Sequence, residues 1–130
     1  LYFMWEIEFT DEFERWWNTL SETAQDSIAV LVTLLEEKGV SLGYPYSSEV
    51  KGTKRISHLR ELRDEVDSRI LRVIYAFDPR RKAILLIGGD KRGDKNWYDT
   101  IIPIAEEIYL NHLKEISREL EGGKLDGSKI

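Results

Sequence analysis

The sequence predicts a single α+β domain, in which a small antiparallel or mixed sheet of four strands carries an N-terminal helical hairpin and a C-terminal helix. Three observations support this fold class. Between residues 59 and 98, short apolar runs alternate with breaks rich in Asp, Ser, Pro and Gly, which is the pattern of strands joined by turns. On both sides of this region, apolar residues recur every three or four positions, as they do in amphipathic helices. The length of 130 residues suits one domain with one core.

The N-terminal region reads as a strand followed by two helices. Residues 1–3 resemble the remnant of a protease-cleavable tag, so the domain is predicted over residues 4–121, with 122–130 as a flexible tail. Residues 4–9 alternate in polarity, as a half-buried edge strand does. Thr10 or Asp11 can cap the first helix, and Ser21 begins a second helix that ends at Gly39. The two helices are expected to form a hairpin that packs on one face of the sheet.

The central region predicts a meander of three strands over residues 59–63, 69–78 and 83–89, which the chain enters through a loop at 40–48. In the middle strand, Leu71 and Val73 share one face by the period of two, whereas Arg72 lies on the other face with Ile74. A charge therefore interrupts an otherwise apolar surface of the sheet. An arginine in this position indicates an anionic partner.

An apolar stripe predicts the C-terminal helix over residues 99–120. Pro103 is tolerable in the first turn of this helix but not deeper, because proline lacks the backbone N–H that later turns use. Gly122 and Gly123 are expected to end the helix.

The composition excludes several classes of protein. The sequence has no run of about eighteen apolar residues that could span a membrane, and it has no secretory signal pattern. It has no cysteine, which excludes disulfides and thiolate chemistry. The two histidines, His58 and His112, lie far apart and have no metal-ligand spacing around them, so no metal site and no cofactor is predicted. We expect a cytoplasmic protein.

Charge is distributed unevenly along the chain. Residues 1–50 carry ten acidic and two basic side chains, whereas residues 51–100 carry thirteen basic and eight acidic ones. The net charge of −5 therefore hides a basic centre within an acidic body. Such a centre could steer a phosphate backbone, because the local field decides this rather than the total charge. The alternative is that these cations only keep the edges of the sheet soluble.

Several short motifs in the central region carry a family resemblance. Glu61-Leu62-Arg63, a short turn, Arg72-Val73-Ile74-Tyr75 and a loop from Lys91-Arg92 to Tyr98 resemble the RelE/HigB group of bacterial toxins, in its phage-derived HigB-like branch. The resemblance implies a RelE-like fold and a ribosome-dependent, metal-independent endoribonuclease that cuts messenger RNA. It also implies a cognate HigA-like helix-turn-helix antitoxin as partner, with operator DNA bound only through the antitoxin and with no membrane contact.

The resemblance also implies the site residues. The catalytic residues it implies are Arg63, Arg72, Lys91, Arg92 and Tyr98, and the RNA-binding residues are Lys54, Arg55, His58, Arg60, Lys95 and Trp97. Trp97 could equally be the first core residue of the last helix. Arginine suits the stabilisation of a phosphorane, because it stays charged and presents a planar fork to phosphate oxygens.

The pattern has no central histidine, and lysine and tyrosine have reference pKa values of about 10. They are poor acid–base groups near neutral pH, so positioning of the RNA by the ribosome is expected to supply much of the rate.

Two other functions fit the same scaffold. ParE-like relatives poison DNA gyrase by contact alone, and a non-catalytic interaction domain would use the basic sheet to receive an acidic partner. For the antitoxin, the sequence permits two docking surfaces, the basic groove and the acidic helical hairpin over residues 11–38. The hairpin is favoured, because Trp16 and Trp17 are placed in its core or at an interface and give a partner apolar area.

Overall fold

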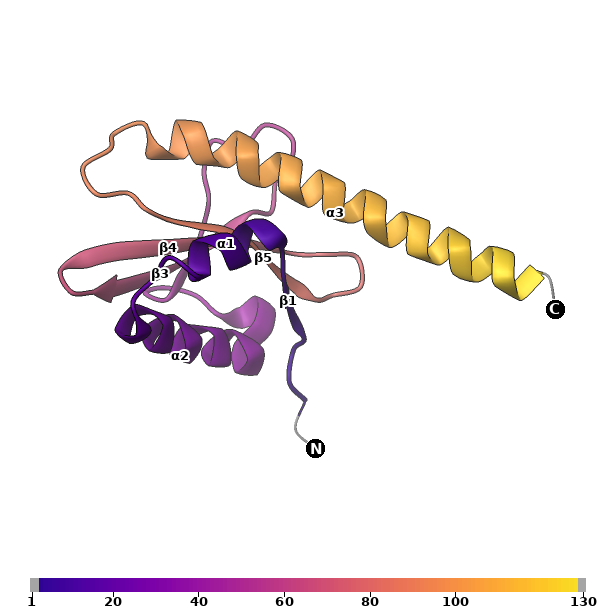
Figure 1. Cartoon of the computed structure of the whole chain (residues 1–130), viewed down its shortest axis with the longest axis horizontal. Helices are drawn as coiled ribbons and strands as arrows, with labels where there is room; N and C mark the ends of the chain where they lie inside the picture. Colours follow the sequence, from indigo (N-terminus) through magenta and orange to yellow (C-terminus); the bar gives the residue numbers. More distant parts are fainter. Residues whose placement is uncertain (1–2, 129–130) are drawn as a thin grey trace.

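The computed structural model describes the backbone of residues 3–128 and the side chains up to Glu121. Its elements follow the chain as β1 (Ile7–Phe9), α1 (Asp11–Trp17), α2 (Glu22–Lys38), the 3-10 turn η1 (Gly39–Ser41), β2 (Ser47–Glu49), β3 (Arg60–Val66), β4 (Arg69–Phe77), β5 (Ala83–Asp90) and α3 (Trp97–Ser128) (Figure 1). The strands form one mixed sheet in the order β1-β5-β4-β3-β2. β1 runs parallel to β5, and the other pairs are antiparallel. The α+β class and the meander are therefore confirmed.

The sheet has five strands rather than four. The additional strand is β2, in which Ser47–Glu49 pair with Arg60–Leu62, and it overlaps the end of the loop predicted at 40–48. Its three residues are polar and show no alternation over a useful length. Pairing with β3 makes this segment a strand, and no local propensity indicated it.

Local capping fixes the helical hairpin. Thr10 Oγ1 accepts a hydrogen bond from the backbone N–H of Phe13, and Ser21 Oγ accepts one from that of Ala24. These side chains satisfy backbone donors that a helix start leaves free. Gly39 ends α2 with a φ of 55°, a left-handed conformation that glycine adopts easily.

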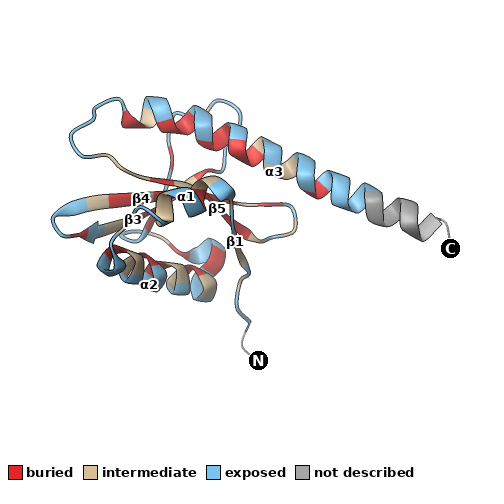
Figure 2. Cartoon of the chain, viewed as in Figure 1, coloured by how far each residue is buried: buried red, intermediate tan, exposed pale blue. Residues whose placement is uncertain are grey.

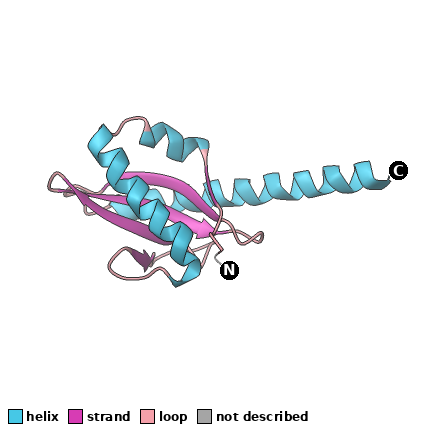
Figure 3. Ribbon diagram, turned by 90° about the horizontal axis from the view of Figure 1, so that it is seen from below, coloured by secondary structure: helices cyan, strands magenta, loops and turns pink. Residues whose placement is uncertain are grey.

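The sheet separates two apolar cores. On one face, α1 and α2 pack over Leu62, Val73 and Tyr75, and on the other face α3 packs over Ile74 and Leu86. Figure 3 shows the helical hairpin and α3 on opposite sides of the strands. We call these surfaces the hairpin face and the α3 face. Because Arg72 falls between Leu71 and Val73 in β4, it lies on the α3 face, as predicted.

α3 is longer than the sheet that it covers. Its described buried residues stop at Ile116, and Figure 2 shows exposed residues beyond this point. Pro103 is the seventh residue of α3, whereas the sequence predicts it in the first turn of the helix. The helix also continues past Gly122 and Gly123, where an end was predicted, because glycine weakens a helix without removing its hydrogen bonds. Of the predicted tail, residues 129–130 lie outside the described residues, as do Leu1 and Tyr2 of the predicted tag remnant.

Two glycines at the end of β5 let tryptophans approach both faces of the sheet. A Cβ on Gly88 would lie 2.2 Å from Cε3 of Trp16 on the hairpin face. A Cβ on Gly89 would lie 2.8 Å from Cζ2 of Trp97 on the α3 face. Each indole thus packs directly on the backbone of β5. Within the described residues, no helix is both long and apolar enough to cross a membrane.

Candidate active site

The sequence-predicted residues meet on the α3 face, where β3, β4 and the start of α3 come together. Strand register places Arg63 opposite Arg72. Glu61 lies two residues before Arg63 and therefore shares its face. Tyr98, in the first turn of α3, reaches down to the same place. The meander thus supplies a carboxylate and two guanidinium groups, and the helix supplies a phenol.

Glu61 and Tyr98 are joined by short hydrogen bonds. The hydroxyl of Tyr98 lies 2.9 Å from Oε1 and 2.8 Å from Oε2 of Glu61, and it donates its proton to this carboxylate. Burial, and then the hydrogen bond to Glu61, raise the pKa of Tyr98 to about 12. Tyr98 is therefore a protonated donor near neutral pH. The side chain of Glu61 is 11% exposed, so a polar group of a bound ligand can still reach it.

Arg72 is a nearly buried cation next to this pair. Its Nε lies 3.8 Å from Oε2 of Glu61, and its Cζ lies 5.9 Å from the centre of the Tyr98 ring. The side chain of Arg72 is 12% exposed, and its buried Nε makes no hydrogen bond to the described residues. A buried donor left without a partner is costly, so this group has capacity for an anionic ligand.

Further cations surround the opening of the site. The ammonium group of Lys91 lies 5.2 Å from the centre of the Tyr98 ring, a cation–π distance. Arg63 and Lys95 are exposed. Arg92 is also exposed, and its Nε lies 3.2 Å from Oδ2 of Asp90 in a surface ion pair. This rim is positively charged, whereas the N-terminal region is acidic.

Trp97 supports the site from below. It is only 8% exposed and belongs to the core between α3 and the sheet. Its ring packs edge to face with that of Tyr98 at 4.9 Å, while its other side covers Gly89. The structure therefore favours the core alternative for Trp97, because an indole held in this way offers little surface to a base.

Four predicted RNA-binding residues lie outside this cluster. Arg60 projects toward the hairpin face, where its guanidinium donates to Ser47 Oγ and to the carbonyl of Leu42. His58 contacts the hydroxyl of Tyr109, eleven residues after Tyr98 on α3, or about 16 Å along the helix axis.

Lys54 and Arg55 belong to a loop fixed to the middle of α3. The backbone N–H groups of Lys54, Arg55 and Ile56 all donate to Oε2 of Glu106. Burial would raise the pKa of Glu106, but these backbone hydrogen bonds lower it below its usual value. The Arg55 guanidinium is already bound to Glu107 at 2.8 Å, whereas the Lys54 side chain is exposed.

Sequence reasoning missed Glu61 as a site residue. A glutamate in a strand is usually a solvent-facing residue, and the sequence indicates Glu61 only as part of the family motif. Its position two residues before Arg63 was the available signal, because period two places both on the face that carries Arg72. Glu61 as a whole residue is 8% exposed. Few glutamates are buried to this degree unless a partner binds their carboxylate.

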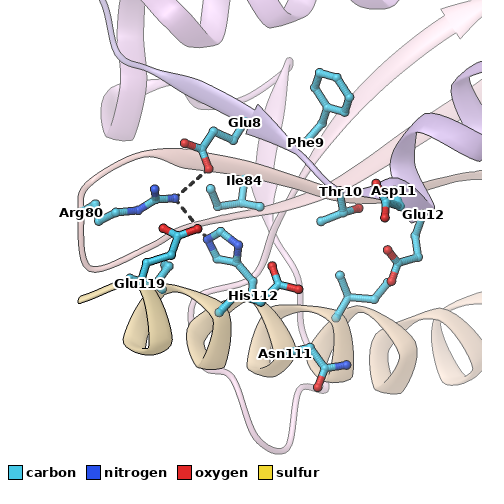
Figure 4. A pocket seen from close by; sticks show the side chains of 13 residues that line it. Glu8, Phe9, Thr10, Asp11, Glu12, Arg80, Ile84, Asn111, His112 and Glu119 are labelled. Carbon is cyan, nitrogen blue, oxygen red and sulfur yellow. Dashed lines mark hydrogen bonds and ion pairs between the residues drawn. The ribbon is translucent and has the colours of Figure 1, made fainter. Parts of the chain in front are cut away.

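A second polar cluster lies at the opposite end of the sheet, around the turn between β4 and β5. Asp78, whose side chain is fully buried, accepts from His112 at 3.0 Å and from Arg80 at 2.7 Å. Burial alone would raise the pKa of Asp78, but the hydrogen bonds from His112 and Arg80 lower it below its usual value. Arg80 also binds Glu8 at 2.7 Å (Figure 4). This network ties the turn to β1 and α3.

The network borders a small hollow of about 230 Å³ between β1 and α3. Its lining includes the carboxylates of Glu8, Asp11, Glu12, Glu115 and Glu119, and we call it the acidic hollow. No group of acidic or histidine side chains in the described part of the chain is arranged to hold a metal ion.

Comparison with known proteins gives the class of this protein. The structure of an arginine-to-alanine double mutant of the Escherichia coli toxin RelE in the free state has the same fold, with a TM-score of 0.52, 10% sequence identity, and coverage of 75% of this chain and 95% of that one. "Putative toxin HigB3" of Mycobacterium tuberculosis is 42% identical over 78% of this chain and 88% of its own length. "Putative toxin HigB2" of the same organism is 34% identical over 84% of this chain, which spans 56% of that relative. These relatives define a toxin of a toxin–antitoxin system, of the HigB kind, and its fold is RelE-like.

The family follows from a further match. Residues 15–110 match the family described as phage-derived Gp49-like proteins, a stretch that includes β2 to β5, Glu61, Arg72 and Tyr98. The chain belongs to this Gp49-like family. The resemblance inferred from the sequence is thereby confirmed, and a toxin of this class has an antitoxin as partner.

Proposed function

We propose that this toxin is a ribosome-dependent endoribonuclease that cuts messenger RNA and so inhibits translation. The observation that carries the proposal is the arrangement of Glu61, Tyr98 and Arg72 on one basic-rimmed face of the sheet. Cleavage of RNA through its own 2′-hydroxyl requires a base, a cation for the crowded phosphate and a proton for the leaving oxygen. These three side chains can meet those requirements by themselves.

Glu61 is the candidate base. Its carboxylate is close to the surface, and the hydrogen bonds from Tyr98 hold it in one orientation. The base is therefore already oriented before the RNA binds. In the first step, Glu61 takes the proton of the ribose 2′-hydroxyl, and the 2′-oxygen forms a bond to phosphorus. This role replaces the histidine that the sequence does not place at the site.

Arg72 is the candidate cation for the phosphate. Its Nε has no hydrogen-bond partner among the described residues, and its other neighbours are a carboxylate and an aromatic ring. The positive charge of Arg72 would offset the added negative charge of the pentacoordinate phosphorus. Arg63, opposite Arg72 in the register, and Lys91 at the rim add positive charge for the adjoining RNA backbone.

Tyr98 is the candidate acid. As the bond from phosphorus to the 5′-oxygen breaks, the leaving oxygen needs a proton, and the Tyr98 hydroxyl carries one at neutral pH, as an ordinary tyrosine does. Burial and the hydrogen bond to Glu61 raise the pKa of Tyr98 to about 12, so the phenol is a weaker acid until that hydrogen bond is released. Once the 2′-hydroxyl has protonated Glu61, the neutral carboxyl is a weaker hydrogen-bond acceptor than the carboxylate was. The phenol can then donate its proton to the leaving oxygen instead. The products are a 2′,3′-cyclic phosphate and a free 5′-hydroxyl.

The proposal of ribosome dependence is supported by the charge of the chain and by the weakness of the acid and the base. A chain of net charge −5 has only a small basic surface for free RNA. Neither histidine can assist, because His58 contacts Tyr109 and His112 is bound to Asp78. An RNA held in line by the ribosome would supply the positioning that these groups cannot.

The test adds the purified toxin to a translating extract and maps the new 5′ ends. Wild-type protein should produce cuts in phase with codons, and Glu61→Gln should reduce their rate by at least about 100-fold while leaving the fold intact. Glu65→Gln, an exposed strand position nearby, is the matched control and should cut normally. Cuts in ribosome-free RNA would refute the dependence on ribosomes. Inhibition of DNA gyrase without any cuts would support the ParE-like alternative.

We further propose that the antitoxin docks on the helical hairpin over residues 11–38. Beside the hairpin lies a groove of about 910 Å³, lined by Phe13, Trp17 and Val32 and rimmed by Glu14 and Glu36, which we call the hairpin groove. Its apolar floor and acidic rim suit a partner with apolar and basic side chains.

Charge reversal at Glu14 and Glu22 together with Trp17→Ala should weaken the complex and spare RNA cleavage. If these changes have no effect on the complex while Arg63→Glu abolishes it, the antitoxin instead covers the active site.

A further inference from the structure

β1 forms one edge of the sheet and has free hydrogen-bonding groups. Glu6 accepts a hydrogen bond from the N–H of Ala83, and the N–H of Thr10 donates to Leu85. Backbone groups alternate in direction along a strand, so those of Ile7 and Phe9 point away from β5. Within the part of the chain that the structure describes, these outward groups make no hydrogen bond. An edge of this kind can accept another strand.

β1 also separates two hollows on opposite faces of the sheet. Ile7 lines the hairpin groove and Glu8 lines the acidic hollow, whereas Phe9 borders both (Figure 4). Phe9 is 58% exposed, which leaves an apolar ring uncovered beside an open strand edge. Natural edges are usually protected by lysine, proline or a covering segment. The three residues of β1 include neither lysine nor proline, but the strand is short, and the N–H of Trp5, two residues before Ile7, donates to the carbonyl of Glu36 in α2. The uncovered part of the edge is therefore Ile7 to Phe9.

The charges at the acidic hollow favour a cationic ligand. Glu8 is already neutralised by Arg80 and Lys82, and His112 and Arg80 are bound to Asp78. The lining also contains four other carboxylates, which belong to Asp11, Glu12, Glu115 and Glu119. These carboxylates line the same hollow as Glu8, on the face of the sheet to which every second side chain of an added strand would point.

We infer that the outer edge of β1 binds an extended segment of a partner protein as a sixth strand, with apolar side chains alternating with lysine or arginine. Alternate residues of a strand point to opposite faces, so the apolar ones enter the hairpin groove and the cationic ones meet the acidic hollow. Identification of this segment as part of the antitoxin rests on the proposed function. A second copy of this chain fits poorly, because it would bring two acidic hollows together.

The β1 edge is separate from the candidate active site. β3, which carries Glu61, lies three strands from β1, or about 14 Å across the sheet. A short segment on β1 therefore leaves Glu61 and Tyr98 free. A complete antitoxin would block the ribosome by its bulk and not by contact with these residues.

The experiment uses the full-length chain and a synthetic nine-residue peptide of alternating valine and lysine. A peptide of the same composition, with its valines and lysines in separate blocks, is the control. Binding is measured by tryptophan fluorescence, since Trp17 lines the hairpin groove, and by amide hydrogen exchange. The alternating peptide should bind at least tenfold more tightly than the block peptide, and it should slow exchange at the amides of Ile7 and Phe9.

Two protein variants test the two components of the site. Phe9→Pro removes an outward N–H without breaking a bond to β5, so it should lower peptide affinity at least tenfold, whereas Phe9→Thr keeps this N–H and should bind more tightly than Phe9→Pro. The double charge reversal Glu115→Lys and Glu119→Lys should also lower affinity at least tenfold and serves as the test if Phe9→Pro fails to fold.

The outcomes decide the inference independently of RNA cleavage. Equal affinity for the two peptides, unchanged exchange at Ile7 and Phe9, or no binding at millimolar peptide would overturn it. Protection of these amides by self-association without peptide would identify a second copy as the occupant and would also overturn it. If the peptide binds as expected but the wild-type toxin makes no cuts in the translating extract, the proposed function fails and the strand-addition site remains.

Discussion

The substitution Gly89→Ala tests whether Trp97 positions the active site without taking part in the reaction. An alanine Cβ would lie 2.8 Å from Cζ2, 3.0 Å from Nε1 and 3.2 Å from Cε2 of Trp97. Carbon atoms pack at about 3.5 Å or more, so the indole must retreat by about 0.7 Å. Such overpacking typically costs about 1–3 kcal/mol of folding free energy.

The same displacement should reach Tyr98, whose ring packs on the indole at 4.9 Å and whose hydroxyl lies 2.8 Å from Glu61. Misplacement of a reacting group by about 1 Å can cost about 100-fold in rate. We therefore expect Gly89→Ala to cut messenger RNA about 10- to 100-fold more slowly. The measurements are urea denaturation for stability and the rate of codon-phased cleavage per folded molecule in the translating extract.

Gly88→Ala is the matched control on the opposite face. Its Cβ would lie 2.2 Å from Cε3 of Trp16, so its loss of stability should be at least as large. Trp16 packs on the hairpin face and has no path to Tyr98, so the folded variant should keep normal activity. The reasoning fails if both variants lose activity equally, or if Gly89→Ala loses stability and cuts RNA at the wild-type rate.

Three further predictions concern individual side chains. Arg72→Ala should abolish cleavage and leave circular dichroism unchanged, whereas an unfolded variant would make Arg72 a structural ion-pair residue. In a spectroscopic titration that uses Tyr98→Phe as the reference, the Tyr98 phenol should ionise at a pH of about 12. Its contribution to stability is therefore present below pH about 10 and is lost as pH rises toward 12. Ionisation near pH of about 10 would contradict the hydrogen bond to Glu61. The pKa of Asp78 is lowered, so its contribution is present above pH about 4 and is lost as pH falls below that value. Asp78→Asn should therefore lower the free energy of unfolding at pH 7 by about 1–3 kcal/mol, measured by urea denaturation, and should flatten the decline of this free energy in acid.

The elements fixed by local chemistry could be predicted from the sequence. Thr10, Ser21 and Gly39 mark the ends of α1 and α2, because capping depends on residues within one turn. The two longest strands, β4 and β5, contain apolar runs that are long enough to be recognised in the sequence. β2 could not be predicted, since Ser47 and its neighbours become a strand only through pairing with β3.

The site was predicted in part for a similar reason. Period two placed Arg72 correctly, and the same rule applied to β3 would have separated Arg60 from Glu61 and Arg63, which lie on the opposite face. Lys54 could not be placed in this way. It lies in a loop whose position depends on Glu106, a residue 52 positions later in the chain.

The order of the strands also governs when the toxin can become active during its own synthesis. β1 is made first but pairs with β5, and Thr10 bonds to Leu86, 76 residues further along the chain. Glu61 likewise bonds to Tyr98, which is 37 residues further along the chain. Contacts between such distant residues form late in folding. A nascent chain that has not yet released the start of α3 therefore has no assembled candidate site.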